Sequence, residues 1–458
     1  MDEQRLERAL RQGPPFATRY APSSLALDEQ PIVRSPFNVG RLSLLIAVTA
    51  LLLVGMLAGL AALGAFRNDD RGASNGWVAF ARGLDPSAGL GERDIYLVRE
   101  GQAAHRIIGS DSDDLDQICP AFSSDGARLA HGEAEGTGDT GYRDAALVIS
   151  DVNAAGNAAE SLRIDVGGTL PPPCANWSPD GRQVAFGVPN RGLPAIWSDV
   201  WVVTLEGLEI DVVSDVFASD LEWSPDGLQL AIASGHTGPV DFDSWRNGAI
   251  SLYSADSGEV RTLGTPSGVW SLSWSPDGTR IAFERDQNTD HRDDQEIWVA
   301  EVDGSAQHLV ASGFSVDHGN GPVWSPAGDW IAYQRICDSN PSNPGAPCRE
   351  LQEIVLIPSD GELAGRAPGE GEVVRPHMQV PGGDGSPYWF PFRVTWSPDG
   401  KQLLYTAEAG TLNFALLAVP VDPGSAPVVL YQGSDISIYD GDGAVPIQSW
   451  GSRVEEQP

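Results

Sequence analysis

The sequence predicts an all-β fold: a seven-bladed β-propeller of four-stranded antiparallel blades, preceded by one transmembrane α-helix. Three observations carry this prediction. A Trp-Ser-Pro-Asp-Gly motif recurs along the chain, a strand-forming motif recurs between its copies, and residues 42–66 form one charge-free apolar run. Repeats at a step of roughly 40 to 50 residues are typical of propeller blades. A six-bladed ring is the alternative, if the terminal segments or the long step between positions 324 and 396 are misread.

Residues 42–66 are expected to be a permanent membrane anchor. The run has no charge between Arg41 and Arg67, and it is longer than the about 20 residues that cross a bilayer. A cleaved signal peptide is the alternative, but its apolar region is normally shorter and nearer the N-terminus. Six arginines in residues 1–41 favour a flexible cytoplasmic tail under the positive-inside rule. We therefore expect a single-pass protein of the cell membrane, with its propeller in the periplasm or at the cell surface.

The apolar run also contains a candidate contact between two copies of the chain. Gly55 and Gly59 are four residues apart, which places them on one face of a helix. Small residues at this spacing let two transmembrane helices approach closely, although glycines in membrane helices also face lipid. The spacing allows a weak homodimer, with lipid-facing glycines as the favoured alternative.

After a linker at 67–75, the propeller domain is expected over residues 76–453. Its motif copies begin at the anchor residues Phe122, Trp177, Trp223, Trp274, Trp324 and Trp396. In the motif, proline presets φ for a turn, the aspartate side chain bonds nearby amides, and glycine accepts a positive φ. Aromatic and branched residues flank each copy, as strands prefer. Each copy therefore predicts a strand, a tight turn and a second strand.

A further strand recurs between the anchors, so that one repeat contains four strands, which we name A to D. Strand A ends at the anchor, the Ser-Pro-Asp-Gly segment is the A–B turn, a longer B–C loop follows, and C–D is a short turn. The expected C strands begin at Asp94, Ala146, Asp199, Ala249, Glu296, Glu353 and Phe414.

The chain has seven expected C strands but six anchors. The first blade begins at strand B, within residues 76–80, with no strand A before it. Residues 446–450 end in Trp450 and supply a degenerate anchor. A C-terminal strand A paired with the N-terminal strands closes the ring and removes open sheet edges.

The Trp-Ser-Pro-Asp-Gly…Ile-Ala-Phe…Ile-Trp-Val pattern resembles the TolB-type, WD-like propeller repeat. The similarity covers about residues 75 to 453 and is specific for the fold. That family includes periplasmic scaffold proteins, propeller domains attached to peptidases and a few lyases, so the resemblance implies no single function. No hydrolase domain is expected after the last strand. The chain departs from the pattern at Phe122-Ser-Ser and at Ala327, where we expect somewhat weaker turns.

The four cysteines suggest two disulfides. Cys119 and Cys174 each stand three residues before an anchor, so they occupy equivalent positions in adjacent blades. Innermost strands are close together in a propeller, which brings such a pair within disulfide reach. Cys337 and Cys348 lie in one expected B–C loop and predict a local bridge. Four buried free thiols are the alternative and would indicate a cytosolic domain.

Binding residues are expected at the rim that carries the B–C and D–A loops, because long loops on a rigid frame concentrate function. Aromatic residues ringed by polar ones mark contact surfaces for proteins or carbohydrates. The alternative for each of these aromatic residues is that its side chain folds over the rim and packs against the blade, with no role in binding. The candidate binding residues are Asp116, Tyr142, Trp197, Asp220, Trp245, Trp270, His291, Asp317, His318, Tyr388 and Trp389.

Charge and motifs limit the other partners. The formal net charge of −34 disfavours nucleic acid and anionic lipid and favours cations or basic partners, or it serves solubility alone. Asp286, Asn288 and Asp290 have the Asp-x-Asn-x-Asp spacing of a calcium loop, but His291 replaces its glycine and Ile297 its glutamate. We therefore expect no cofactor, with Ca²⁺ as the weaker possibility.

Two functions follow as alternatives. The first is an interaction scaffold: a membrane-anchored extracytoplasmic propeller that binds a protein, a peptide or a glycan. The second is an anchored lyase or hydrolase acting on a polysaccharide or peptide at the channel mouth. The sequence contains no nucleophile elbow, phosphate loop or dinucleotide fingerprint, which favours the first. Propeller enzymes assemble catalytic residues from distant blades, which keeps His318 and His291 open as candidates for the second.

Overall fold

The computed structural model describes residues 76–83, 93–108, 115–136, 142–167, 173–189, 198–216, 218–234, 249–265, 268–286, 295–314, 321–339, 348–359, 372–374, 389–409, 414–421, 428–433 and 448–450. They belong to one compact unit, Asp70–Pro458, which is considered by itself. Across these ranges no helix is long and apolar enough to cross a membrane. The predicted tail, anchor and linker, with Gly55 and Gly59, lie outside the described residues.

The strands form seven four-stranded antiparallel sheets, which confirms the predicted propeller. Blade 1 contains β28 (Gln448–Trp450), β1 (Val78–Gly83), β2 (Arg93–Val98) and β3 (His105–Ile108). Blade 2 contains β4 (Leu115–Phe122), β5 (Arg128–Gly136), β6 (Tyr142–Val152) and β7 (Ala158–Asp165). Blade 3 contains β8 (Asn176–Trp177), β9 (Gln183–Pro189), β10 (Ser198–Thr204) and β11 (Glu209–Val216).

The remaining blades follow the same order. Blade 4 contains β12 (Ala218–Trp223), β13 (Gln229–Ser234), β14 (Ala249–Ser254) and β15 (Val260–Leu263). Blade 5 contains β16 (Val269–Trp274), β17 (Arg280–Asp286), β18 (Gln295–Glu301) and β19 (Gln307–Phe314). Blade 6 contains β20 (Val323–Trp324), β21 (Trp330–Ser339), β22 (Cys348–Pro358) and β23 (Glu372–Val374), and blade 7 contains β24 (Trp389–Trp396), β25 (Gln402–Ala409), β26 (Phe414–Pro420) and β27 (Val428–Gly433).

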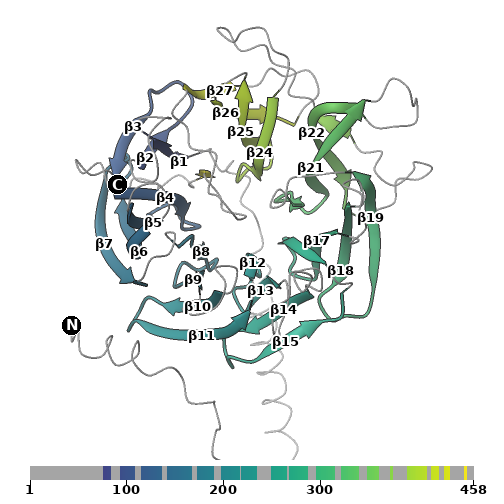
Figure 1. The fold of residues 1–458 in the computed structure, drawn as a ribbon, viewed down its shortest axis with the longest axis horizontal. Coiled ribbons are helices and arrows are strands. Elements are labelled where there is room, and N and C mark those ends of the chain that lie inside the picture. The colour runs from purple at the N-terminus through teal and green to yellow at the C-terminus, as the bar shows by residue number, and fades with distance from the viewer. Residues whose placement is uncertain are drawn as a thin grey trace, which may run out of the picture. The chain divides into compact units, whose positions relative to one another are not determined.

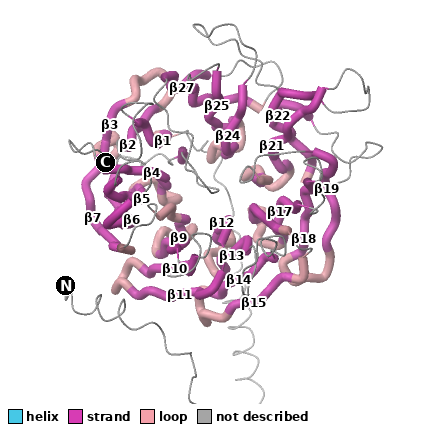
Figure 2. The backbone as a smooth tube through the Cα atoms, in the orientation of Figure 1, coloured by secondary structure: helices cyan, strands magenta, loops and turns pink. Residues whose placement is uncertain are grey.

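The expected strand order A–B–C–D and the expected closure are both present. In Figure 1 the strand colours run around the propeller unit from β1 to β27, and Figure 2 shows the same succession with strands in magenta. Strand β28 pairs antiparallel with β1, with Trp450 opposite Val78. The C-terminal strand thus completes the N-terminal blade, and no six-bladed arrangement fits.

One cluster of buried apolar side chains fills each seam between neighbouring blades. At the seam between blades 7 and 1, for example, Leu404 and Leu416 pack with Val78 and Phe80. At the seam between blades 4 and 5, the cluster joins Ala231 and Ile250 to Phe283 and Trp274, among others. The two faces of each blade therefore lie in two different clusters, as period-2 alternation requires. Burial between blades, rather than within them, forms the core.

The anchor tryptophans join each blade to the one before it. Four indole N–H groups donate to the carbonyl oxygen of the residue directly before the preceding anchor. Trp274 Nε1, for example, lies 3.0 Å from the Glu222 oxygen. The buried Trp324 Nε1 has no hydrogen-bond partner within the described residues. A buried indole N–H normally finds an acceptor, so this repeated contact explains why the anchor is tryptophan rather than another aromatic residue.

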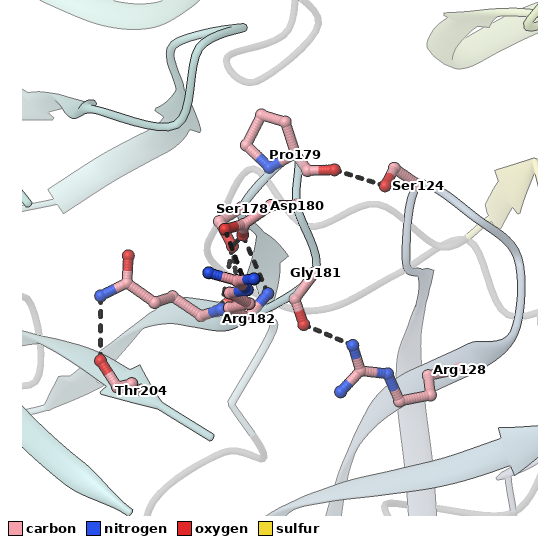
Figure 3. Close-up of polar contacts among 9 residues, drawn as sticks. Ser124, Arg128, Ser178, Pro179, Asp180, Gly181, Arg182 and Thr204 are labelled. Atoms are coloured by element: carbon pink, nitrogen blue, oxygen red, sulfur yellow. Dashed lines mark hydrogen bonds and ion pairs between the residues drawn. The ribbon is translucent and has the colours of Figure 1, made fainter. Parts of the chain in front are cut away.

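The Ser-Pro-Asp-Gly segments are turns closed by their own side chains (Figure 3). In blade 3, Ser178 Oγ donates to Asp180 Oδ1 at 2.8 Å and accepts from the Gln183 N–H at 2.9 Å. Gly181 has a φ of 66°, the left-handed region that other residues rarely adopt. Arg128 of blade 2 donates to the Gly181 carbonyl oxygen at 2.5 Å. The turn thus also contacts the neighbouring blade.

Both departures from the motif keep the turn hydrogen bonds. Where Ala327 replaces the aspartate, Asp329 takes its place two residues later and Ser325 Oγ donates to it at 2.8 Å. In the first copy, Ser123 Oγ still donates to Asp125 at 2.6 Å. Ser124, in the proline position, donates to the Pro179 carbonyl oxygen of the next turn at 2.5 Å. The expected weakening is therefore offset by other bonds.

The predicted Cys119–Cys174 disulfide is present, with a Cα–Cα distance of 5.3 Å. Cys119 lies in β4 and Cys174 precedes β8, so the bridge joins blades 2 and 3. Cys337 and Cys348 lie in the paired strands β21 and β22 rather than in a loop, and Cys348 stands opposite Ser339. The side chains of this second pair lie outside the described residues, and its bridge stays a prediction.

We predict that Trp274→Phe lowers the free energy of unfolding by about 1–2 kcal/mol more than Trp324→Phe does. Both changes remove similar apolar area, but only the Trp274 indole has a hydrogen-bond acceptor, the Glu222 carbonyl oxygen, to lose. Urea denaturation of both variants measures the difference. Equal losses would show that the indole N–H bond contributes nothing to the seam.

Removing the confirmed disulfide should destabilise the propeller strongly. Cys119 and Cys174 are separated by 55 residues, and closing a loop of that length is worth about 4 kcal/mol in the chain-entropy account. We expect a loss of this size in the double Cys→Ser variant, measured by denaturation without reductant.

Non-reducing peptide mapping of the wild type should recover both this bridge and Cys337–Cys348. Alkylatable thiols at 337 and 348 would contradict the second bridge.

Candidate functional site

Strand order separates the two rims of the propeller. The A–B turns lie at one rim, which we call the turn rim; there Gly227, Gly278 and Gly400 each lie against the proline of the preceding turn. The B–C and D–A connections leave from the opposite strand ends, which we call the loop rim. The B–C connections are residues 84–92, 137–141, 190–197, 235–248, 287–294, 340–347 and 410–413, and the D–A connections are residues 109–114, 166–175, 217, 264–268, 315–322, 375–388 and 434–447. All B–C and D–A connections therefore belong to the loop rim. The C–D connections belong to the turn rim, and the one in blade 6 spans residues 359–371, so the expected short C–D turn is wrong there.

Two predicted binding residues form one buried cluster at the loop rim. Asp116 is the second residue of strand A of blade 2 and is completely buried. It accepts from Arg93 Nε at 2.7 Å and from the Tyr142 hydroxyl at 3.0 Å, and Arg93 belongs to blade 1. Arg93 also donates to the Tyr142 hydroxyl at 3.0 Å. The cluster joins the strand ends that flank connections 84–92, 109–114 and 137–141, so these side chains hold the loop rim together.

A second polar cluster lies on the innermost strands of blades 4 and 5. The inner edge of a strand A has no strand beside it, so its amides need other partners. Asp220 Oδ2 accepts from the Leu272 N–H at 3.0 Å, and Glu222 Oε2 accepts from the Trp274 N–H at 3.0 Å. Ser219 Oγ donates to the Trp270 carbonyl oxygen at 2.7 Å. The predicted residues Asp220 and Trp270 are thus brought together here.

Glu222 has an unusual titration. Withdrawal of its carboxyl from water, together with the nearby charge of Asp220, raises its pKa to about 8, against the hydrogen bonds from the Trp274 N–H and Ser273. The carboxyl is shielded even though the residue as a whole is only partly buried. A carboxylic acid that keeps its proton near neutral pH is a candidate general acid. Here the same group also bonds blade 4 to blade 5.

Blade 5 continues this cluster toward blade 6. Ser271 Oγ donates to the buried Glu284 at 3.2 Å, and the Trp324 N–H donates to Ser273 Oγ at 3.2 Å. A Cβ added to Gly321 would lie 1.6 Å from Ser271 Oγ, so the backbone of blade 6 approaches blade 5 where only glycine fits. Sequence reasoning missed Glu222, Glu284 and Gly321. The available signal was Glu222 directly before its anchor, where the other anchors of the chain follow uncharged residues.

The remaining predicted site residues divide into two groups. Trp389 begins β24 and Asp286 ends β17, while their side chains lie outside the described residues. Among the residues that the structure describes, no group of three or more His, Cys, Asp or Glu side chains is placed to hold a metal ion. The others lie wholly outside the described residues: Trp197, Trp245, Asn288, Asp290, His291, Asp317, His318 and Tyr388.

Comparison with known proteins supports the fold. No protein-family model matches the chain, and no curated protein matches it. Solved structures do match. The periplasmic gluconolactonase PpgL of Pseudomonas aeruginosa is 14% identical over 82% of this chain and 99% of that one, with a TM-score of 0.50. A structure from a study of two prolyl endopeptidases is 13% identical over 84% of this chain and 55% of that one, also at 0.50.

The structural neighbours also include TolB proteins. TolB from Acinetobacter baumannii is 17% identical, with a TM-score of 0.41, and the match covers 62% of each chain. The chain thus matches less than two thirds of that protein's length. Similarities at these identities show the β-propeller fold and leave the activity open.

We predict that Glu222→Gln stabilises the protein increasingly from pH 5 to pH 8. The folded protein keeps a proton on Glu222 up to about pH 8, whereas the unfolded chain releases it near 4.5. Wild-type stability therefore falls as pH rises through this window, by up to about 1.4 kcal/mol per pH unit. Glutamine removes this dependence and keeps an acceptor for Trp274. Thermal unfolding against pH tests it, with the exposed Glu259→Gln as control; parallel curves for all three proteins would contradict the assignment.

Proposed function

We propose that this chain is a membrane-anchored extracytoplasmic propeller that binds a protein, peptide or glycan ligand through the loop rim. The observation that carries the proposal is the asymmetry of the two rims. At the turn rim the A–B turns are short, and their side chains are used within the turns and against neighbouring blades, although the C–D connection of blade 6 at this rim spans residues 359–371. The loop rim carries the connections that contain Trp197, Trp245 and Tyr388, and in blades 1 and 2 its strand ends are fixed by the buried Arg93–Asp116 pair. Rigid frames of this kind present variable loops to ligands.

The disulfide supports the proposed compartment. A bridge between Cys119 and Cys174 persists in oxidising surroundings and is rare in the cytosol. This supports an outward-facing propeller behind the proposed anchor at residues 42–66, with the tail 1–41 in the cytoplasm. Gly55 and Gly59 are the proposed seam of a weak dimer. The strong negative charge argues against nucleic acid as the ligand.

An anchored enzyme is the second candidate function. The proton-holding Glu222 beside Asp220 favours it, since perturbed carboxyls gather at catalytic sites. The hydrogen bond from the Trp274 N–H to Glu222 and the one from the Leu272 N–H to Asp220 explain the same pair structurally. Binding is therefore the preferred proposal, with a lyase or hydrolase acting on polysaccharide or peptide as the alternative.

Capture of ligand by the full-length protein tests the proposal. Immobilised detergent-solubilised chain should retain one envelope component in stoichiometric amount. Replacing Trp197, Trp245 and Tyr388 by alanine should abolish capture, whereas Leu228→Ser, an exposed position at the turn rim, should leave it unchanged. Capture that survives the triple substitution would place binding elsewhere. Turnover of a polysaccharide or peptide that His318→Ala abolishes would favour the enzyme instead.

The proposed orientation of the chain across the membrane is tested separately. Protease added to intact cells should degrade the propeller and spare the tail. A soluble protein whose N-terminus begins near residue 67 would contradict the anchor and leave the ligand proposal standing.

A further inference from the structure

One of the seven seams between blades differs from the others at its centre. In each blade, one residue of strand B stands opposite the anchor, and the residue two positions later packs against the preceding blade. In blade 3, for example, Val184 stands opposite Trp177, and Phe186 is the packing residue. In six blades it is a buried aromatic or aliphatic residue: Phe80, Phe186, Ile232, Phe283, Tyr333 and Tyr405. Blade 2 has His131 at the same place, two residues after Leu129, which stands opposite Phe122.

His131 is completely buried, and neither of its ring nitrogens has a hydrogen-bond partner within the described part of the chain. It lies on the same face of β5 as Leu129, because side chains alternate along a strand. Leu129 packs against Ala79, Ile95 and Leu97 of blade 1. The imidazole is therefore inserted into an apolar seam that elsewhere holds a larger apolar side chain.

The charged groups around His131 are already engaged with one another. On its own strand, Glu133 is bonded by Arg163 of β7 and by Gln117 of β4, the latter at 3.1 Å. Toward the loop rim, Arg93 of blade 1 is paired with Asp116. Toward the turn rim, His105 of blade 1 faces the Gly156 carbonyl oxygen at 3.3 Å. On the faces of β1 and β2 that pack here, Ala79, Ala81, Ile95 and Leu97 offer no group to a charged imidazole.

Removal from water accordingly lowers the pKa of His131 to about 4; Glu133 opposes this shift and Arg163 adds to it. The histidine is neutral in the folded protein near pH 7. In the unfolded chain it takes up a proton near pH 6.5. The stability of this seam is therefore complete above pH 6.5 and is lost as pH falls toward 4, since the unfolded or opened chain binds the extra proton.

We propose that the seam between blades 1 and 2 is an acid-labile joint, which opens when His131 is protonated while the other seams stay closed. Two features confine the opening to this place. The Cys119–Cys174 disulfide holds blade 2 to blade 3. Blade 1 is completed by β28, whose pairing with β1 covers Val78, Ala79 and Phe80 within the described residues. Because the Arg93–Asp116–Tyr142 cluster crosses the same seam, opening also releases one sector of the loop rim.

Hydrogen exchange of the full-length protein, measured by mass spectrometry between pH 7 and pH 4.5 and corrected for intrinsic rates, tests the joint. Protection of amides in β1, β2 and β5 should fall by up to about tenfold per pH unit below pH 6.5, while β13 and β17 stay protected. His131→Phe, which restores the residue type of the other seams, should abolish the acid-induced loss.

The repeat offers a matched control. Phe283→His places a histidine at the equivalent position of blade 5 and should transfer the acid sensitivity to β13 and β17. If Phe283→His does not fold, His131→Gln serves as a second variant beside His131→Phe. Glutamine cannot be protonated, so it too should abolish the acid-induced loss of protection. Acid-induced exchange in β1 and β5 that persists in either His131 variant, or that rises equally in all blades of the wild type, would overturn the proposal. Loss of ligand capture by the loop-rim variants bears on the proposed function alone and leaves this joint untouched.

Discussion

The contact between each anchor tryptophan and the inner strand of the preceding blade is the interaction on which the propeller depends. An innermost strand has one edge without a neighbouring strand, and its polar backbone groups cannot be left unpaired. The indole covers apolar surface in the seam and donates its N–H to the carbonyl oxygen before the previous anchor. Apolar burial and backbone pairing are thus satisfied by one side chain, which explains why the motif recurs with each blade.

Polar side chains also pair backbone amides of neighbouring inner strands, beside the anchor contacts. In blade 4, Asp220 and Glu222 satisfy amides of blade 5, and Ser273 of blade 5 satisfies an amide of blade 6. Shielding a carboxyl in this way raises the pKa of Glu222, and shielding an imidazole lowers that of His131. The two groups make opposite contributions to stability as pH changes. Both stand at positions where most blades carry an uncharged residue, and such departures from a repeat are where function is expected.

The side chains at the two rims are used in different ways. Side chains of the short turns are used within each turn and against the next one, as Ser124 and Arg128 show beside the blade 3 turn (Figure 3). At the opposite rim, the buried Arg93–Asp116 pair fixes the strand ends from which the longer connections leave. A disulfide adds a covalent link between blades 2 and 3. These contacts fix strand ends from which the longer connections leave, an arrangement that supports the proposed binding role.

The sequence by itself determined the repeat, the strand order within a blade, the closure by residues 446–450 and the Cys119–Cys174 pair. Each of these depends on local turn chemistry or on equal offsets from an anchor, both of which can be read along the chain. Only the tertiary structure showed that Asp116 and Tyr142 bind Arg93, that Asp329 replaces the aspartate missing at Ala327, and that Glu222 and His131 lie shielded between blades. These contacts join residues of different strands or blades, and a linear pattern specifies the face on which a side chain lies but not the partner that it meets across a seam.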